Sequence, residues 1–185
     1  MKRLLTIITI VFGAFLSITE AQAQENYRAL NLGFGIGGHS GYSRYAGRPV
    51  PVFHINYEFD VARNFTLAPF ISFYTYSDSY NWSNDNYTYR ETVIPVGVKG
   101  SYYFDELFDA SSNWDFYAAA SLGFAIVNSR WEAGYNGDKN YFNRGRAVFA
   151  DLHAGAQYNF SRKAGVYLDL SSGISTIGLA FHQSR

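Results

Sequence analysis

From Ala29 onward, large apolar residues alternate with small or polar residues at a period of two. In the first such segment, positions 30, 32, 34 and 36 are Leu, Leu, Phe and Ile. The odd-numbered positions from 29 to 37 are Ala, Asn and three Gly. A period of two is typical of β-strands with one apolar face. The same alternation predicts seven further strands, over residues 51–60, 65–74, 93–104, 116–126, 148–160, 166–171 and 177–181.

The connections between these segments alternate between long and short. Long connections cover residues 38–48, 77–90 and 128–146, and tight ones cover 61–64 and 161–164; residues 105–113 and 172–175 depart from the rule. Long loops on one side and tight turns on the other are typical of an up-and-down barrel in a membrane. The chain is therefore predicted to be all-β, an eight-stranded antiparallel up-and-down transmembrane β-barrel.

The size of the side chains indicates which face of the strands points inward. An eight-stranded barrel has an interior just wide enough for side chains to fill, so the small and polar set is expected in the lumen and the large apolar set outside. Tyr74, Tyr117 and Tyr167 belong to the inward set, and with the polar residues they leave little room for a pore. The predicted polar network of the lumen consists of His54, Glu58, Asp60, Lys99, Asp151, His153 and Asp169.

The first 23 residues have the pattern of a Sec signal peptide. Lys2 and Arg3 precede an apolar run over residues 4–18, and Ala21-Gln22-Ala23 supplies the small-x-small cleavage pattern. We expect residues 1–23 to be removed and residues 24–185 to form the barrel domain. Together with the barrel pattern, this export signal predicts a protein of the outer membrane in a Gram-negative cell envelope.

Composition excludes several classes of protein. The 15 basic and 15 acidic residues become 13 and 14 without Lys2, Arg3 and Glu20, and a near-neutral chain lacks the basic surface that nucleic acid requires. The absence of cysteine excludes disulfides and a lipoprotein anchor. The content of 16 Tyr, 16 Phe and 17 Gly favours strands over helices.

The segment "LGFGIGG" at residues 32–38 matches the spacing G-x-G-x-x-G of dinucleotide-binding loops. That mechanism needs a helix that opens on the glycines, and the following "HSGYSRYAGR" has the composition of a loop. We therefore interpret Gly33, Gly35 and Gly37 as one face of the first strand, where they leave room for larger side chains of the lumen.

Three segments resemble the small outer-membrane β-barrel, or porin-like, family of OmpA/OmpX type: "IPVGVKGSYYF" (94–104), "NWDFYAAASLGFAI" (113–126) and "GVYLDLSSGISTIGLAF" (165–181). The resemblance extends over essentially the whole mature chain. It implies an eight-stranded barrel in contact with outer-membrane lipid, with both termini in the periplasm. It also implies insertion by the outer-membrane assembly machinery.

The sequence offers little evidence of catalysis. The sequence contains no zinc-protease, hydrolase-elbow or P-loop motif, and we expect no metal or cofactor. Two alternatives to a non-enzymatic barrel remain. "GHS" (38–40) and "FHQS" (181–184) provide the residue types of a lipid-modifying barrel enzyme, and a soluble, secreted lipocalin-like binding barrel would also show alternating strands.

The long loops are the better candidates for function, because binding residues are often placed on loops of a rigid scaffold. Those at 77–90 and 128–146 are rich in Tyr, Asn, Ser and Trp, which suit adaptable recognition. The predicted role is structural or surface interaction, with an extracellular ligand bound through these loops. The recognition candidates are Tyr80, Trp82, Tyr87, Trp131, Tyr135 and Tyr141.

Overall fold

The structure, a computed structural model, describes residues 28–37, 50–82, 85–104, 113–134 and 148–183. Among these residues there is no helix long and apolar enough to cross a membrane. The strands are β1 (Arg28–Gly37), β2 (Val50–Ala62), β3 (Phe65–Trp82), β4 (Asp85–Tyr103), β5 (Trp114–Trp131), β6 (Val148–Ser161), β7 (Ala164–Ser171) and β8 (Ile174–His182).

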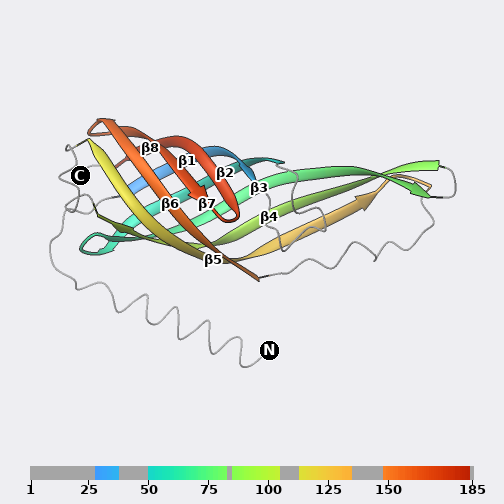
Figure 1. Cartoon of the computed structure of the whole chain (residues 1–185), viewed down its shortest axis with the longest axis horizontal. Coiled ribbons are helices and arrows are strands. Elements are labelled where there is room, and N and C mark those ends of the chain that lie inside the picture. The colour runs from blue at the N-terminus through green and yellow to red at the C-terminus, as the bar shows by residue number, and fades with distance from the viewer. Residues whose placement is uncertain (1–27, 38–49, 83–84, 105–112, 135–147, 184–185) are drawn as a thin grey trace, which may run out of the picture.

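The eight strands close into one barrel, in which each strand pairs with its neighbours in the sequence (Figure 1). All pairs are antiparallel, and β1 completes the barrel by pairing with both β2 and β8. Leu32, for example, lies opposite Ile55 on one side and Leu179 on the other. The predicted eight-stranded, antiparallel, up-and-down barrel is thus confirmed.

Large apolar side chains point away from the barrel on all eight strands. Leu152 exposes 72% of its surface and Ile36 exposes 60%, whereas Asn31 on the inward face of β1 exposes 4%. A soluble monomer seldom exposes so large an apolar surface. Such a belt is the outer face that a barrel presents to lipid, and the predicted assignment of the two faces is confirmed.

Tight turns between β2 and β3 and between β6 and β7 lie at one end of the barrel, which we call the turn end. Asn64 has a φ of 59°, a left-handed conformation that asparagine tolerates. The backbone N–H of Gln183 donates to the carbonyl of Arg28 at 2.8 Å, so β1 begins and β8 ends at the same place. These two turns and both ends of the described barrel therefore share one side.

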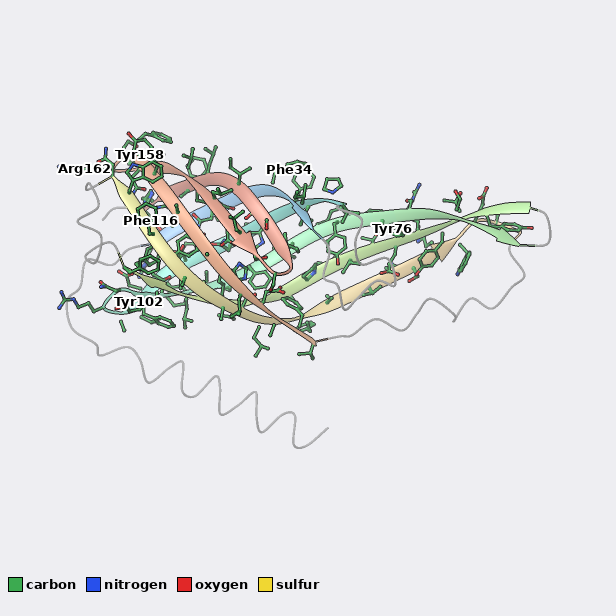
Figure 2. All side chains as sticks on the ribbon, viewed as in Figure 1. Phe34, Tyr76, Tyr102, Phe116, Tyr158 and Arg162 are labelled. Atoms are coloured by element: carbon green, nitrogen blue, oxygen red, sulfur yellow. The ribbon has the colours of Figure 1, made fainter. Side chains whose placement is uncertain are left out.

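Aromatic side chains gather around the turn end. The rings of Trp114 and Phe116 are nearly parallel, with centroids 5.9 Å apart, and Trp114 also lies 5.0 Å from the ring of Tyr158. Figure 2 shows Phe116, Tyr158 and Tyr102 at this end, together with Arg162. Such an arrangement is typical of the aromatic belt at a membrane interface.

At the opposite end, β3, β4 and β5 extend well beyond the other strands (Figure 1). Among the described residues, β2 pairs with β3 only as far as Phe73, and β6 pairs with β5 only as far as Phe124. The β3–β4 pairing continues to Trp82 and Asp85. We call the part formed by residues 74–82, 85–93 and 127–131 the protruding sheet.

The predicted loop over residues 77–90 is therefore wrong, because this segment is a paired β-hairpin. Ser77, Ser79, Thr88 and Arg90 are exposed there and Tyr89 is buried, so the apolar alternation that indicates the barrel strands is missing. The loop predicted from residue 128 is also wrong in its first part, since β5 continues to Trp131. Residues 135–146 and the predicted loop at 38–48 lie outside the described residues.

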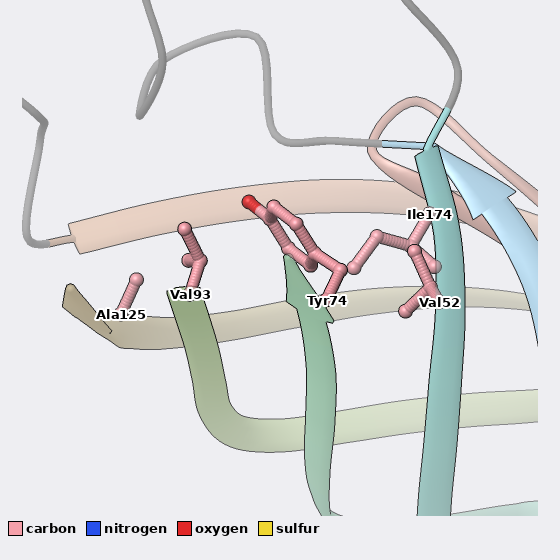
Figure 3. Packing of buried hydrophobic residues seen from close by; sticks show 5 residues of the cluster. All are labelled: Val52, Tyr74, Val93, Ala125 and Ile174. Atoms are coloured by element: carbon pink, nitrogen blue, oxygen red, sulfur yellow. The ribbon is translucent and has the colours of Figure 1, made fainter. Parts of the chain in front are cut away.

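An apolar cluster fills the lumen at the base of the protruding sheet (Figure 3). Four of its members come from neighbouring strands and one from β8, and all are at least nine-tenths buried: Val52, Tyr74, Val93, Ala125 and Ile174. Phe149, Val50 and Val127 pack against them. This cluster occupies the interior where the barrel meets the protruding sheet.

Glycines of the inward face make room for aromatic rings from other strands. A Cβ on Gly33 would collide with the hydroxyl of Tyr167, and a Cβ on Gly155 would collide with the ring of Tyr117. Gly33 and Gly35 lie inside β1 and not in a turn after it, so they lack the geometry of a dinucleotide-binding loop. The predicted spatial role is confirmed for Gly33, whereas a Cβ on Gly35 or Gly37 would first meet the backbone of Ser175 or Gly173.

Candidate functional site

Asp169 on β7 is the centre of a polar network inside the barrel. Its Oδ2 lies 2.9 Å from Lys99 Nζ of β4 and accepts a hydrogen bond of 2.8 Å from the hydroxyl of Tyr117 on β5. Its Oδ1 lies 2.7 Å from Nδ1 of His153 on β6. Lys99 Nζ also lies 5.0 Å from the centre of the Tyr117 ring. One carboxylate thus joins three strands to β7 across the lumen.

His153 extends this network to Ser121 on β5. Nδ1 donates to the carboxylate of Asp169, and Nε2 lies 3.0 Å from the Ser121 hydroxyl. The order serine, histidine, aspartate is that of a hydrolase triad. The adjoining cavity has a volume of about 20 Å³, which holds about one water molecule and no acyl substrate. The arrangement therefore suits a structural hydrogen-bond network.

A second chain of hydrogen bonds follows β2 toward the turn end. His54 Nε2 accepts from Asn56 Nδ2 at 3.1 Å, which leaves the proton on Nδ1 to be donated to Ser72 Oγ at 2.8 Å. Asn31 donates to Asn56 at 2.9 Å and to Glu58 at 3.1 Å.

Glu58 is the last residue of this chain of hydrogen bonds. The hydroxyls of Thr66 and Tyr103 donate to its Oε1 at 2.5 and 2.6 Å, in addition to the bond from Asn31. Charge-assisted hydrogen bonds of this kind offset the cost of burying a carboxylate. Because Glu58 is 2% exposed, these three donors take the place of water around it.

The structure brings together some of the seven predicted lumen residues and separates others. Lys99 and His153 both contact Asp169 directly, whereas His54 is connected to Glu58 through Asn56 and Asn31. Asp151 lines the same cavity and accepts a hydrogen bond of 3.2 Å from Ser172 in the β7–β8 turn. Asp60 is half-buried near the turn end, opposite Thr66.

Several residues of these networks were missed by the sequence analysis. Ser121, Asn31 and Asn56 contribute hydrogen bonds and lie at inward positions of the alternating pattern, and Tyr117, which was predicted to point inward, has a hydrogen bond that was not predicted. The signal that would have found them is the face they share with the charged residues. Among the described residues, no group of three or more His, Cys, Asp or Glu side chains has the geometry to hold a metal ion.

The predicted recognition residues fall on the protruding sheet where they are described. Tyr80 and Trp82 are on β3, Tyr87 is on β4, and Trp131 is the last residue of β5. Tyr87 and Trp131 are half-buried. Tyr135 and Tyr141 lie outside the described residues. These candidates are thus carried by paired strands, which hold them more rigidly than a loop would.

Hydrogen bonds connect the strands of the protruding sheet. On its inward face, the Tyr89 hydroxyl lies 2.5 Å from Glu91 Oε2 and 3.0 Å from Ser129 Oγ, and its ring lies 4.9 Å from that of Trp131. Burial raises the pKa of Glu91, and the hydrogen bond from Tyr89 opposes this shift. Burial therefore favours the neutral form of this carboxyl group.

The sequence matches no family model and no curated protein, but solved structures share its fold. Neisserial surface protein A is 11% identical with a TM-score of 0.50, and the match covers 88% of this chain and 97% of that one. The N-terminal barrel domain of Pseudomonas aeruginosa OprF is 11% identical with a TM-score of 0.48, over 88% of this chain and 100% of that one.

Ail from Yersinia pestis, solved in complex with the heparin analogue sucrose octasulfate, is 12% identical with a TM-score of 0.46. This match covers 86% of the present chain and 100% of Ail. The closed barrel, its outward apolar belt and the likeness to the neisserial protein define the class. The chain has the transmembrane β-barrel fold of the small eight-stranded outer-membrane proteins.

Proposed function

We propose that this protein is a non-enzymatic barrel of the outer membrane that holds the protruding sheet outside the cell for surface interactions. The observation that supports this role is the length of β3, β4 and β5, which continue past the barrel while the outward residues change from apolar to polar. Residues 1–23 act as the Sec signal peptide, and residues 24–185 form the barrel. The outer-membrane assembly machinery inserts it among outer-membrane lipids.

The closed lumen supports a scaffold role in preference to a pore. Ion pairs and hydrogen bonds fill the middle of the barrel, and the apolar cluster around Tyr74 fills the end beneath the protruding sheet. A filled interior stiffens the wall from which β3, β4 and β5 project. In vesicles, the protein is therefore expected not to admit sugars, and free sugar passage would contradict the scaffold role.

Single cysteines test the proposed topology, because the chain has none of its own. Ser79→Cys, exposed on the protruding sheet, should react with a polymer-linked maleimide added to intact cells. Arg162→Cys, exposed at the turn end, should react only after the cells are permeabilised. The reverse result, or recovery of the protein in the soluble periplasm, would overturn the proposal.

A shortened hairpin tests the interaction role separately. Residues 79–88 are replaced by Asn-Gly, which joins the paired residues Asp78 and Tyr89 through a tight turn. The variant should keep the different gel mobilities of unheated and heated barrel. Cells that display it should adhere less than cells with the full chain to surfaces coated with heparin or collagen. Equal adherence on both surfaces would remove the role assigned to the protruding sheet.

A further inference from the structure

The outward face of β3, β4 and β5 changes abruptly from apolar to polar at one level. Phe73, Ile94 and Ile126 are the last apolar residues of this face on the three strands. The next outward position on each strand is Thr75, Thr92 or Asn128. The Thr75 and Thr92 hydroxyls lie 3.3 Å apart across the two strands. This change marks the upper boundary of the apolar belt.

Two arginines lie side by side at the next outward position. Arg90 of β4 is directly opposite Arg130 of β5, and both are exposed. Residues opposite one another in an antiparallel pair have Cβ atoms about 5 Å apart, and like charges at that spacing repel. Ser77 lies beside Arg90 on β3 and adds a hydroxyl to the same face.

Only one acidic side chain of the described residues shares this part of the face. Glu132 lies two positions beyond Arg130 on β5, and its carboxylate accepts the backbone N–H of Thr88 at 2.8 Å. Glu91 lies on the opposite, inward face of β4. The two arginines therefore leave an excess of positive charge, bordered by hydroxyl and amide groups.

The height of the pair above the apolar belt fits a lipid headgroup. Arg90 is four residues from Ile94, about 14 Å along the strand at 3.4 Å per residue and less along the membrane normal, because barrel strands are tilted. The headgroup layer is roughly 5–8 Å thick on each side of the hydrocarbon core. An arginine side chain is long enough to place its guanidinium group within that layer.

We infer that Arg90 and Arg130 form a binding site for the phosphate of a phosphorylated lipid in the outer leaflet of the membrane. Guanidinium groups bind phosphate through paired, charge-assisted hydrogen bonds, and one phosphate neutralises the repulsion between the two arginines. Thr75, Ser77, Thr92 and Asn128 offer further hydrogen bonds to the sugar or glycerol next to the phosphate. The inference rests on the proposed placement in the outer membrane.

The test uses the full mature chain, folded in neutral detergent micelles, and measures bound lipid by native mass spectrometry. The probe is bisphosphorylated lipid A, compared with the same lipid after enzymatic removal of its phosphates. Arg90→Gln/Arg130→Gln should retain about 30-fold less lipid A, because each arginine contributes to the free energy of binding at a charged lipid surface. The dephosphorylated lipid should bind all variants equally weakly.

The matched control is Arg162→Gln/Lys163→Gln, which removes two exposed cations at the turn end. Its net charge equals that of Arg90→Gln/Arg130→Gln. It should retain lipid A as the unaltered chain does. Equal losses in the two double variants, or no loss in either, would overturn the inference. The gel mobility of unheated samples shows that each variant is folded.

Two further measurements distinguish binding of the lipid from binding of other anions. Inorganic phosphate alone should not bind measurably, and a sulfated oligosaccharide should not displace lipid A. If either binds in an arginine-dependent manner while lipid A does not, the lipid assignment is wrong. A folded barrel that fails to bind lipid A contradicts this inference alone, whereas failure of the cysteine-labelling pattern contradicts the proposed function.

Discussion

Lys99 and Asp169 form an ion pair across the lumen, with Nζ and Oδ2 2.9 Å apart and with side chains that are 7% and 4% exposed. The two residues lie on β4 and β7, which are not neighbours in the barrel. The pair therefore ties opposite parts of the wall together. Removal of one partner leaves the other charge buried and without its counter-ion.

Asp169→Ala is expected to lower the free energy of unfolding by about 3–5 kcal/mol, because the Lys99 ammonium group is left buried without its carboxylate. Lys99→Met/Asp169→Ala should be more stable than Asp169→Ala alone, since no unpaired charge remains. Urea unfolding of the protein in micelles, followed by tryptophan fluorescence, measures both. Strictly additive effects of the two single substitutions would show that the pair is not coupled.

Gly33 and Tyr167 give a second prediction, which depends only on the lack of space between Gly33 and the Tyr167 hydroxyl. Gly33→Ala places a methyl group against the Tyr167 hydroxyl and should cost about 1–3 kcal/mol of stability. Tyr167→Phe removes the obstructing oxygen and should restore most of that loss. Gly178→Ala is the matched control, because its methyl group would meet the backbone of Leu32, and Tyr167→Phe should not rescue it. Equal rescue of both variants would contradict the proposed contact.

The alternating pattern predicted which residues of each strand point into the lumen, but not which of these residues contact one another there. Lys99, His153 and Asp169 were placed in the lumen because each lies on the face opposite the large apolar residues of its strand. Their contact depends on strand tilt and register, which set the height of each residue along the barrel. Register across the lumen is not encoded in any local stretch of sequence, so the bond from Tyr117 to Asp169 was not predicted.

The protruding sheet was missed for a different reason. The apolar signal of a strand comes from a face in contact with lipid or a core, and the outward face of this sheet is polar from Thr75 and Thr92 onward. Its stability comes from pairing between β3, β4 and β5 and from contacts such as Tyr89 with Trp131. Polar Tyr, Asn and Ser residues in such a sheet resemble a loop in composition.

Ser121 provides a test of the enzymatic alternative. Because the adjoining cavity is about 20 Å³, the Ser121 hydroxyl should not react with a fluorophosphonate, despite its bond to His153. Intact-mass measurement of the folded protein after incubation should show no added phosphonyl group. Ser121→Ala should lower stability by about 1 kcal/mol through loss of one hydrogen bond. Labelling that is lost in Ser121→Ala would instead indicate an activated serine.

Glu91 should make the protruding sheet more stable at acid pH. Burial raises the pKa of Glu91 above its ordinary 4.5, so the folded sheet binds this proton more tightly than the unfolded chain. The stabilisation is present below that ordinary value and is lost as the pH rises through the raised pKa. Hydrogen–deuterium exchange of the amides at 86–93, corrected for intrinsic rates, should show this loss. Glu91→Gln should abolish this stabilisation in acid at the amides other than that of Thr88, and an unchanged profile in that variant would contradict the assignment.

Glu132 should act with the opposite sign at the end of the same sheet. The backbone N–H of Thr88 donates to its carboxylate at 2.8 Å and lowers the pKa of Glu132, so the ionised form is favoured in the folded sheet. Its stabilisation is present above the ordinary pKa and is lost as the pH falls through the lowered value. Glu132→Gln should therefore increase exchange of the Thr88 amide at neutral pH and leave it nearly unchanged in acid. Because the side chain is exposed, salt should weaken the effect, and a difference that grows in acid would contradict the prediction.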